Sequence, residues 1–185
     1  VRATCKRMQN DALAWLVTGE DRFLTDAMEQ MEAIFDEDRW PRWPDQAHLD
    51  MGLEADLRTG QFMRSLGYVY DWLYRGLSDG DRRWIVENLD RRGIQPYLRE
   101  LERECWFTVT TSMNNWNTCV VGGAGTTAMA LGEEHPESGH ILEHAVDLMD
   151  KYGSVLGDEG EFNESVGYSG SMNLPVQFHA AYRYH

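Results

Sequence analysis

The sequence predicts an all-α chain, and three observations carry that prediction. Apolar residues recur at helical spacing along most of the 185 residues. Residue types that end or begin helices stand between these segments, as Gly19 does after the first and Ser78 before a later one. The connections are short, and no strand–helix–strand unit interrupts the series. This pattern is typical of antiparallel helical hairpins, packed either as a bundle or as an α/α toroid.

The first half of the chain contains three expected helices, which cover residues 3–17, 21–35 and 49–77. A polar and aromatic connection, residues 36–45, separates the second from the third. Its two Trp-Pro steps disfavour helix at Trp40 and Trp43. We therefore expect the first substantial loop of the chain here.

The second half contains four more expected helices, over residues 79–89, 94–104, 115–131 and 140–156, and a last one after the loop 157–165. Ser78, with Asp81 three residues later, is a variant of the capping box. The helix that follows is expected to stop near Gly93, and the next one starts with Pro96 in its first turn. Residues 106–111 are the one stretch rich in strand formers.

The charge of the chain limits its partners. There are 31 acidic and 17 basic residues, and the formal net charge is −14. A field of this sign repels nucleic acid and anionic membrane surfaces, so neither is expected as a partner. No apolar run approaches the roughly 20 residues of a membrane-spanning helix. A densely sulfated polysaccharide would also be repelled unless arginines gather locally.

Metal and disulfide frameworks are not expected. Cys5, Cys105 and Cys119 are odd in number and widely spaced, so we interpret them as small buried side chains, with a single disulfide left open. His140 and His144 have the i, i+4 spacing of metal ligands, but no third ligand accompanies them. We therefore predict no metal and no cofactor.

Three segments follow one another in an informative order. The first runs from His48-Leu-Asp through Tyr70-Asp-Trp-Leu-Tyr74 to Leu77-Ser-Asp. The second is Asn114-Asn-Trp-Asn117 followed by Gly122-Gly123. The third, residues 158–168, reads Asp-Glu-Gly-Glu-Phe-Asn-Glu-Ser-Val-Gly-Tyr. Together they cover most of the chain and resemble the early hairpins, the "NNWN … GG" block and the "DG … EG-x-GY" segment of heparinase II/III-like polysaccharide lyases.

The resemblance implies a fold and an activity. It implies an incomplete α/α toroid, with residues 1–185 forming part of that one domain and a β-sandwich domain following it in a longer parent protein. It implies cleavage of a uronic-acid-containing polysaccharide by β-elimination, in the periplasm or outside the cell. We expect the 185 residues alone to be inactive, and to self-associate through helix faces that the missing part would cover.

The resemblance also implies catalytic residues. A polar pair, here Asn114 and Asn115, would neutralise the uronate carboxylate, and Tyr168 would donate and accept the proton. Asn115 stands where catalytic members often carry His. Amide donors on the carboxylate stabilise the enolate-like state that forms when the C5 proton leaves. A tyrosine base needs a nearby positive charge, for which Arg39, Arg42 and Arg183 are candidates.

Further residues are expected to bind the substrate, namely Trp116, Trp40, Trp43, His48 and Glu164. Other interpretations stay open. The asparagines also suit helix capping, Tyr168 suits packing, and the tryptophans suit a loop pinned to the core. Two functions rival the lyase: a glycan-binding helical domain without activity, and an inverting toroid glycoside hydrolase that uses Glu161 or Asp158, with Glu161 and Glu164 as a carboxylate pair.

Overall fold

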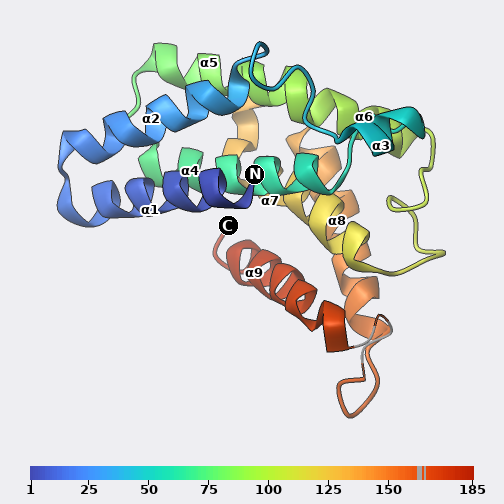
Figure 1. Ribbon diagram of the computed structural model, residues 1–185. Helices are drawn as coiled ribbons and strands as arrows, with labels where there is room; N and C mark the ends of the chain where they lie inside the picture. Colours follow the sequence, from blue (N-terminus) through green and yellow to red (C-terminus); the bar gives the residue numbers. More distant parts are fainter. Residues whose placement is uncertain (162–163, 165) are drawn as a thin grey trace.

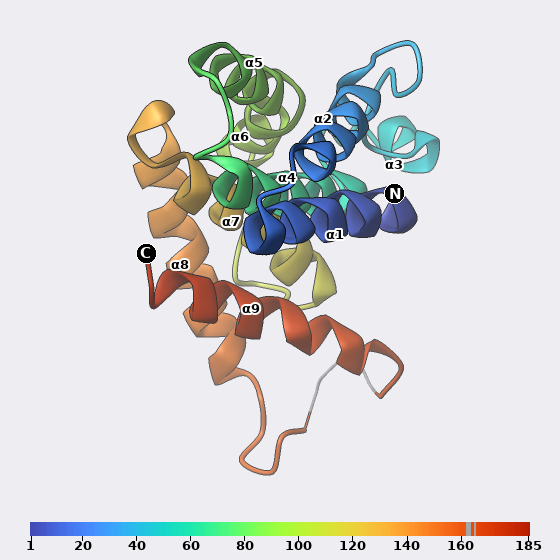
Figure 2. The same cartoon turned by 90° about the vertical axis from the view of Figure 1, so that its left-hand side faces the viewer.

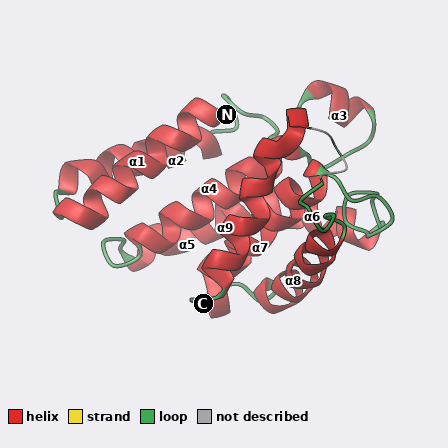
Figure 3. Cartoon of the chain, turned by 90° about the horizontal axis from the view of Figure 1, so that it is seen from below, coloured by secondary structure: helices red, strands yellow, loops and turns green. Residues whose placement is uncertain are grey.

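The computed structural model describes residues 1–161, 164 and 166–185, and within these residues every regular element is a helix (Figure 3). The all-α prediction is therefore confirmed. No helix in the described part of the chain is both long enough and apolar enough to cross a membrane. The three cysteines are free; Cys5 and Cys119 are buried and Cys105 is partly exposed.

The first two helices form an antiparallel hairpin (Figure 1). α1 (Arg2–Thr18) ends because Gly19 adopts the left-handed conformation, with φ 69°, and donates its N–H to the Trp15 carbonyl. α2 (Asp21–Phe35) returns alongside it. Met8 and Met31, one from each helix, are completely buried. The expected helices 3–17 and 21–35 agree with these two elements to within a residue or so.

The centre of the molecule is the pair α4 (Leu57–Leu73) and α7 (Gly122–Leu131). α4 packs against α7 on one side and against α1 on another, so most of its residues are buried. α7 is made almost wholly of small and apolar residues and is buried along nearly all its length. Such a helix is expected at the middle of a fold rather than at its surface.

The expected continuous helix 49–77 is wrong in its first third. A short helix, α3 (Gln46–Asp50), is followed by turns, and α4 begins only after Asp56. Asp56 is the N-cap of α4, and its side chain accepts hydrogen bonds from the N–H groups of Arg58 and Thr59. The cap favours the start of α4 at this point because its carboxylate satisfies N–H groups that have no partner inside a helix.

The next segment is one nearly unbroken helical rod rather than two helices. α5 (Asp79–Leu89) passes into a π-helical turn, η1 (Asp90–Ile94), and then into α6 (Gln95–Glu102). The capping box of Ser78 and Asp81 is confirmed, as is Pro96 in the first turn of α6. The expected stop near Gly93 is wrong. Gly93 stays helical because the absence of a side chain lets Met63 and Trp43 pack against its backbone.

Residues 106–111 form turns, so their strand-forming composition does not produce a strand. No neighbouring strand exists among the described residues to pair with them. The buried side chain of Asn117 holds the loop instead, since its Nδ2 donates to the carbonyls of Phe107 at 2.9 Å and Val109 at 3.3 Å.

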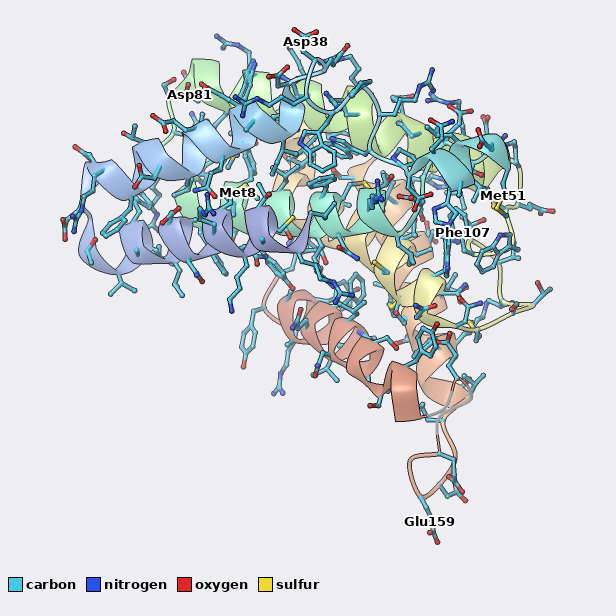
Figure 4. The ribbon with its side chains drawn as sticks, viewed as in Figure 1. Met8, Asp38, Met51, Asp81, Phe107 and Glu159 are labelled. Atoms are coloured by element: carbon cyan, nitrogen blue, oxygen red, sulfur yellow. The ribbon has the colours of Figure 1, made fainter. Side chains whose placement is uncertain are left out.

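The last third wraps around α7. The π-helical turn η2 (Asn117–Val121) leads into α7, and η3 (Gly132–Glu134) leads into α8 (Ser138–Ser154), which packs along α7. A 3₁₀ segment, η4 (Val166–Met172), precedes α9 (Asn173–Tyr182). In the view of Figure 2, α9 lies below α1 and α7 and beside the lower part of α8. The loop segment 155–161, which follows α8, projects outward, with Glu159 at its tip (Figure 4).

Candidate functional site

A cavity of about 570 Å³ lies among α1, α4, η2, η4 and the start of α9. This volume falls within the range of small-molecule and cofactor sites, about 300–1,000 Å³. Fifteen of the described residues line it: Arg2, Cys5, Lys6, Gln9, Leu57, Gln61, Arg64, Ser65, Asn115, Cys119, Gly167, Tyr168, Gly170, Ser171 and Leu174. The chain brings them together from both ends and from the middle.

The wall from α1 and α4 carries three cationic side chains. Arg2 and Lys6 are four residues apart on α1 and therefore lie on one side of it. Arg64 lies on α4, against which α1 packs. Gln9, Gln61 and Ser65 add neutral polar groups along the same wall. We call Arg2, Lys6 and Arg64 the cationic wall.

The described residues supply no counter-charge to the cationic wall. None of the described lining residues is acidic. No carboxylate in the described part of the chain forms an ion pair with Arg2, Lys6 or Arg64, although the protein carries 31 acidic residues. The Nη1 atom of Arg64 is buried and has no hydrogen-bond partner among the described residues. Such an atom is costly to leave unpaired.

The other wall holds Asn115 and Tyr168. Asn115 is the first residue of the helical segment that continues into η2 and α7, and it is partly buried. Tyr168 lies in η4 and is 53% exposed, so its ring stands at the rim of the cavity. The Ser171 hydroxyl donates to the Tyr168 carbonyl at 2.7 Å and fixes the turn that presents the ring. These two residues, distant in sequence, thus line one cavity.

Asn114 does not line this cavity. Its side-chain oxygen accepts the N–H of Trp116 at 2.9 Å, and its amide nitrogen donates to Ser112. The side chain therefore closes a local turn before the helix, which is the capping role that asparagine often plays. Of the predicted asparagine pair, only Asn115 lines the cavity.

The two buried thiols form an unreactive part of the wall. Burial raises the pKa of the Cys119 thiol to about 11, and burial also raises the pKa of Cys5. Cys119 donates through its Sγ to the Leu57 carbonyl at 3.4 Å. Both side chains stay neutral at physiological pH, so neither acts as a nucleophile.

Glu164 lies beside Asn115 rather than on the cavity surface. The backbone N–H of Asn115 donates to its carboxylate, while its Oε2 is buried without a partner among the described residues. Burial raises the pKa of Glu164, and the hydrogen bond from Asn115 opposes that rise. Glu164 therefore connects the segment before Tyr168 to Asn115.

The predicted aromatic platform is only partly accessible. Trp43 is 1% exposed, and it lies 5.1 Å from Phe62 and 6.1 Å from Phe35, measured between ring centroids. Its faces are covered, so the prediction that Trp43 stacks on a sugar is wrong. Trp40 is half-buried against Phe62, and its carbonyl accepts a hydrogen bond from Arg92. Neither tryptophan lines the cavity.

Trp116 and His48 form a contact of their own outside the cavity, with ring centroids 4.8 Å apart in an edge-to-face arrangement. His48 Nδ1 lies 2.8 Å from Asp56 Oδ2 and 3.1 Å from Asp45 Oδ1. The metal-binding atoms of these three residues lie within 4.8 Å of one another. Hydrogen bonds account for this cluster, because the buried Asp56 oxygens already accept three backbone N–H groups.

Other residues considered from the sequence lie elsewhere. Both ring nitrogens of His144 are occupied, by the Tyr97 hydroxyl and the Thr108 carbonyl, each at 2.8 Å, so His144 cannot also bind a metal. Arg39, Arg42 and Arg183 do not line the cavity. Asp158 and Glu161 are exposed in the projecting loop, away from the cavity lining. The positive charges near Tyr168 come from the cationic wall instead.

The sequence contains a signal for the cationic wall in the polar residues that lie beside the buried positions of two helices. Arg2, Lys6 and Gln9 form a polar stripe on α1 beside the buried positions Cys5 and Met8. Gln61, Arg64 and Ser65 form a similar stripe on a helix that is otherwise buried. A polar stripe next to a core face indicates a lined cavity when two helices place their stripes together.

No family model matches the chain, and the comparison with curated proteins finds no match either.

Proposed function

We propose that this protein is part of a polysaccharide lyase that cleaves a uronic-acid-containing polysaccharide by β-elimination. The observation that carries the proposal is that Asn115 and Tyr168, from distant segments, line one open cavity that has no acidic group among its described lining residues. A negatively charged sugar could enter such a cavity without meeting a like charge. The resemblance of three ordered segments to heparinase II/III-like lyases supports the same reaction.

Each residue has a defined task in this reaction. Asn115 donates its side-chain amide to the uronate carboxylate, which stabilises negative charge as the C5 proton leaves. Tyr168 removes that proton and then protonates the glycosidic oxygen, so the bond to the leaving sugar breaks and a C4–C5 double bond forms. Tyr168 enters this cycle as the phenolate, becomes the phenol when it takes the C5 proton, and returns to the phenolate when it protonates the leaving oxygen. No cofactor takes part.

The fold proposed with this function is an incomplete α/α toroid of antiparallel hairpins, of which residues 1–185 form part. The pairs α1–α2 and α7–α8, each joined by a short connection, support it (Figure 1). Exposed apolar side chains on the outer part of α1, Leu13, Leu16 and Val17, support self-association or contact with further parts of the protein.

The lining of the cavity favours elimination over hydrolysis. An inverting hydrolase needs two carboxyl groups on either side of the scissile bond. Asp158 and Glu161 lie on the projecting loop instead, and Glu164 is turned toward the backbone of Asn115. A glycan-binding domain without activity would use the same cavity, and turnover distinguishes the two.

The test is turnover of uronate polymers by the protein at its full natural length. We expect unsaturated products, detected by the ultraviolet absorbance of their new double bond, and loss of that signal in Tyr168→Phe. Saturated reducing ends would show hydrolysis instead. Binding without any product would show a glycan-binding domain. Either result would refute the lyase proposal.

A further inference from the structure

We propose that Arg2, Lys6 and Arg64 form a second acid-binding site, which holds the carboxylate of the sugar next to the one bound by Asn115 and Tyr168. This inference rests on the proposed function. It goes further by assigning a specificity: the protein recognises two acidic sugars in sequence. The ligand class is therefore an oligosaccharide with uronates on adjacent residues.

The first argument is the unpaired state of the three cations. Elsewhere in the described chain, arginines on the surface pair readily, as Arg99 does with Glu54 at 2.6 Å and Arg22 with Glu20 at 2.9 Å. In a protein with a net charge of −14, these three cations line one cavity in which none of the described lining residues is acidic. The free energy of this arrangement improves when an external anion enters.

The second argument is the buried Nη1 atom of Arg64. A guanidinium nitrogen that is removed from water and has no partner among the described residues is unfavourable by itself. A carboxylate on the cavity side would accept hydrogen bonds from a guanidinium in the paired geometry that arginine favours. Lysine and arginine on α1, at the surface, would complete the binding of a single acidic group.

The third argument is that the cavity has two chemically different walls. Arg2, Lys6 and Arg64 belong to α1 and α4, whereas Asn115 and Tyr168 belong to the segments of η2 and η4. Asn115 supplies neutral donors for the carboxylate beside the reacting carbon. Full positive charge on the other wall suits an acidic group that is bound but not activated. The cavity, at about 570 Å³, exceeds what one small acid would need.

The test uses binding and needs no turnover. Three probes are titrated into the Tyr168→Phe protein by calorimetry: a saturated di-uronide, its single-sugar uronate, and the di-uronide with one carboxylate blocked as a methyl ester. Arg64→Gln and Lys6→Gln should each weaken the di-uronide about tenfold, the value of one charge-assisted hydrogen bond. The same two substitutions should change the affinity for the single-sugar uronate much less. The methyl ester should bind to the protein that carries only Tyr168→Phe as weakly as the unblocked di-uronide binds to the protein that also carries Arg64→Gln.

The matched control is Arg7→Gln, which removes the same charge from the same exposed helix but does not line the cavity. Its affinity for the di-uronide should stay within about twofold, since a distant surface charge is screened by salt. Equal effects of Arg7→Gln and Lys6→Gln would refute the proposal. If Arg64→Gln does not fold, Lys6→Gln and Arg2→Gln, both at exposed positions, decide the matter.

Two outcomes separate this inference from the proposed function. Charge-dependent binding of the di-uronide, without turnover by the unmodified protein at its full natural length, would refute the lyase and leave the acid-binding site standing. Turnover that is insensitive to Arg64→Gln and Lys6→Gln would support the lyase and refute the acid-binding site. Inorganic phosphate that binds as tightly as the di-uronide would reveal a general anion site and overturn the assignment to a neighbouring sugar.

Discussion

Gly60 of α4 and Gly123 of α7 bring the backbones of the two central helices into direct contact. A Cβ atom on Gly123 would lie closer than 3.0 Å to the carbonyl oxygen of Gly60, and one on Gly60 would collide with the carbonyl of Cys119. The obstacle in both directions is backbone, which cannot move aside as a flexible side chain would. The close approach also brings Arg64 and Cys119 to the same cavity.

Substituting either glycine should therefore destabilise the fold strongly. We expect Gly123→Ala to lower the free energy of unfolding by about 3 kcal/mol or more, because the two helices must separate along their length. Chemical denaturation followed by circular dichroism measures this. Gly139→Ala on α8, where nothing lies within 4 Å of the new methyl group, is the matched control and should be neutral or slightly stabilising. Similar losses in both variants would contradict the interpretation.

The cap of α4 should contribute more than an ordinary helix cap. Asp56 is fully buried and binds the N–H of Asp45 and the ring of His48 in addition to its own helix. Asp56→Ala should cost about 3 kcal/mol, since it removes the cap and leaves buried donors unpaired. Ser78→Ala removes an exposed capping box of the same type and should cost about 1 kcal/mol. Equal losses in thermal or denaturant unfolding would count against this ranking.

The buried pair of Tyr97 and His144 should make stability depend on pH. Burial lowers the pKa of His144 from its ordinary value of 6.5, and the two hydrogen bonds of its ring suit the neutral form. The unfolded chain therefore binds more protons than the folded one at acidic pH. The contribution of His144 to stability is fully present above pH 6.5 and is lost as the pH falls through the lowered pKa.

The measurement is the denaturation midpoint as a function of pH from 8 down to about 4. His144→Gln should flatten the decline below pH 6.5 while lowering stability at neutral pH, because it removes the titrating group along with its packing. His185→Gln, an exposed change that is not among the groups that shift the pKa of His144, should leave the profile of the parent protein unchanged. If stability still falls as steeply below pH 6.5 in His144→Gln, groups other than His144 cause the fall.

The sequence predicted the elements whose boundaries depend on local chemistry. Gly19 and Ser78 act on their own neighbours, so their residue types suffice to end and begin helices. Gly93 was predicted wrongly because its role depends on distant residues: Met63 and Trp43 occupy the space that a side chain would fill. Asp56 was missed for the same reason, since its partners include Asp45 and His48 across a turn.

The candidate site, like the helix boundaries, was predicted only in part. The resemblance to a family supplied Asn115 and Tyr168, whereas nothing in their own periodicity links them. The burial of Trp43 and the cationic wall depend on which faces of helices meet, and single-helix patterns do not contain that information. Arg2 and Arg64 are the clearest example. They are far apart in the sequence, and they line one cavity because α1 packs on α4.

The assignment of Tyr168 and Asn115 predicts two different kinetic defects in the protein at its natural length. Tyr168→Phe removes one hydroxyl from a ring that is 53% exposed, so folding and substrate binding should change little while turnover is lost. Asn115→Ala should weaken both binding and rate, with about 2–4 kcal/mol lost in the transition state if its amide stabilises the developing charge.

Steady-state kinetics on a uronate polymer, together with calorimetric binding, separate these defects. Tyr184→Phe is the matched control for the tyrosine, since that ring is also exposed and does not line the cavity; it should keep full activity. A Tyr168→Phe protein that retains substantial turnover would show that another group moves the proton. An Asn115→Ala protein with normal kcat and a raised KM would assign to Asn115 a role in binding alone, because a group that stabilises only the transition state must lower kcat.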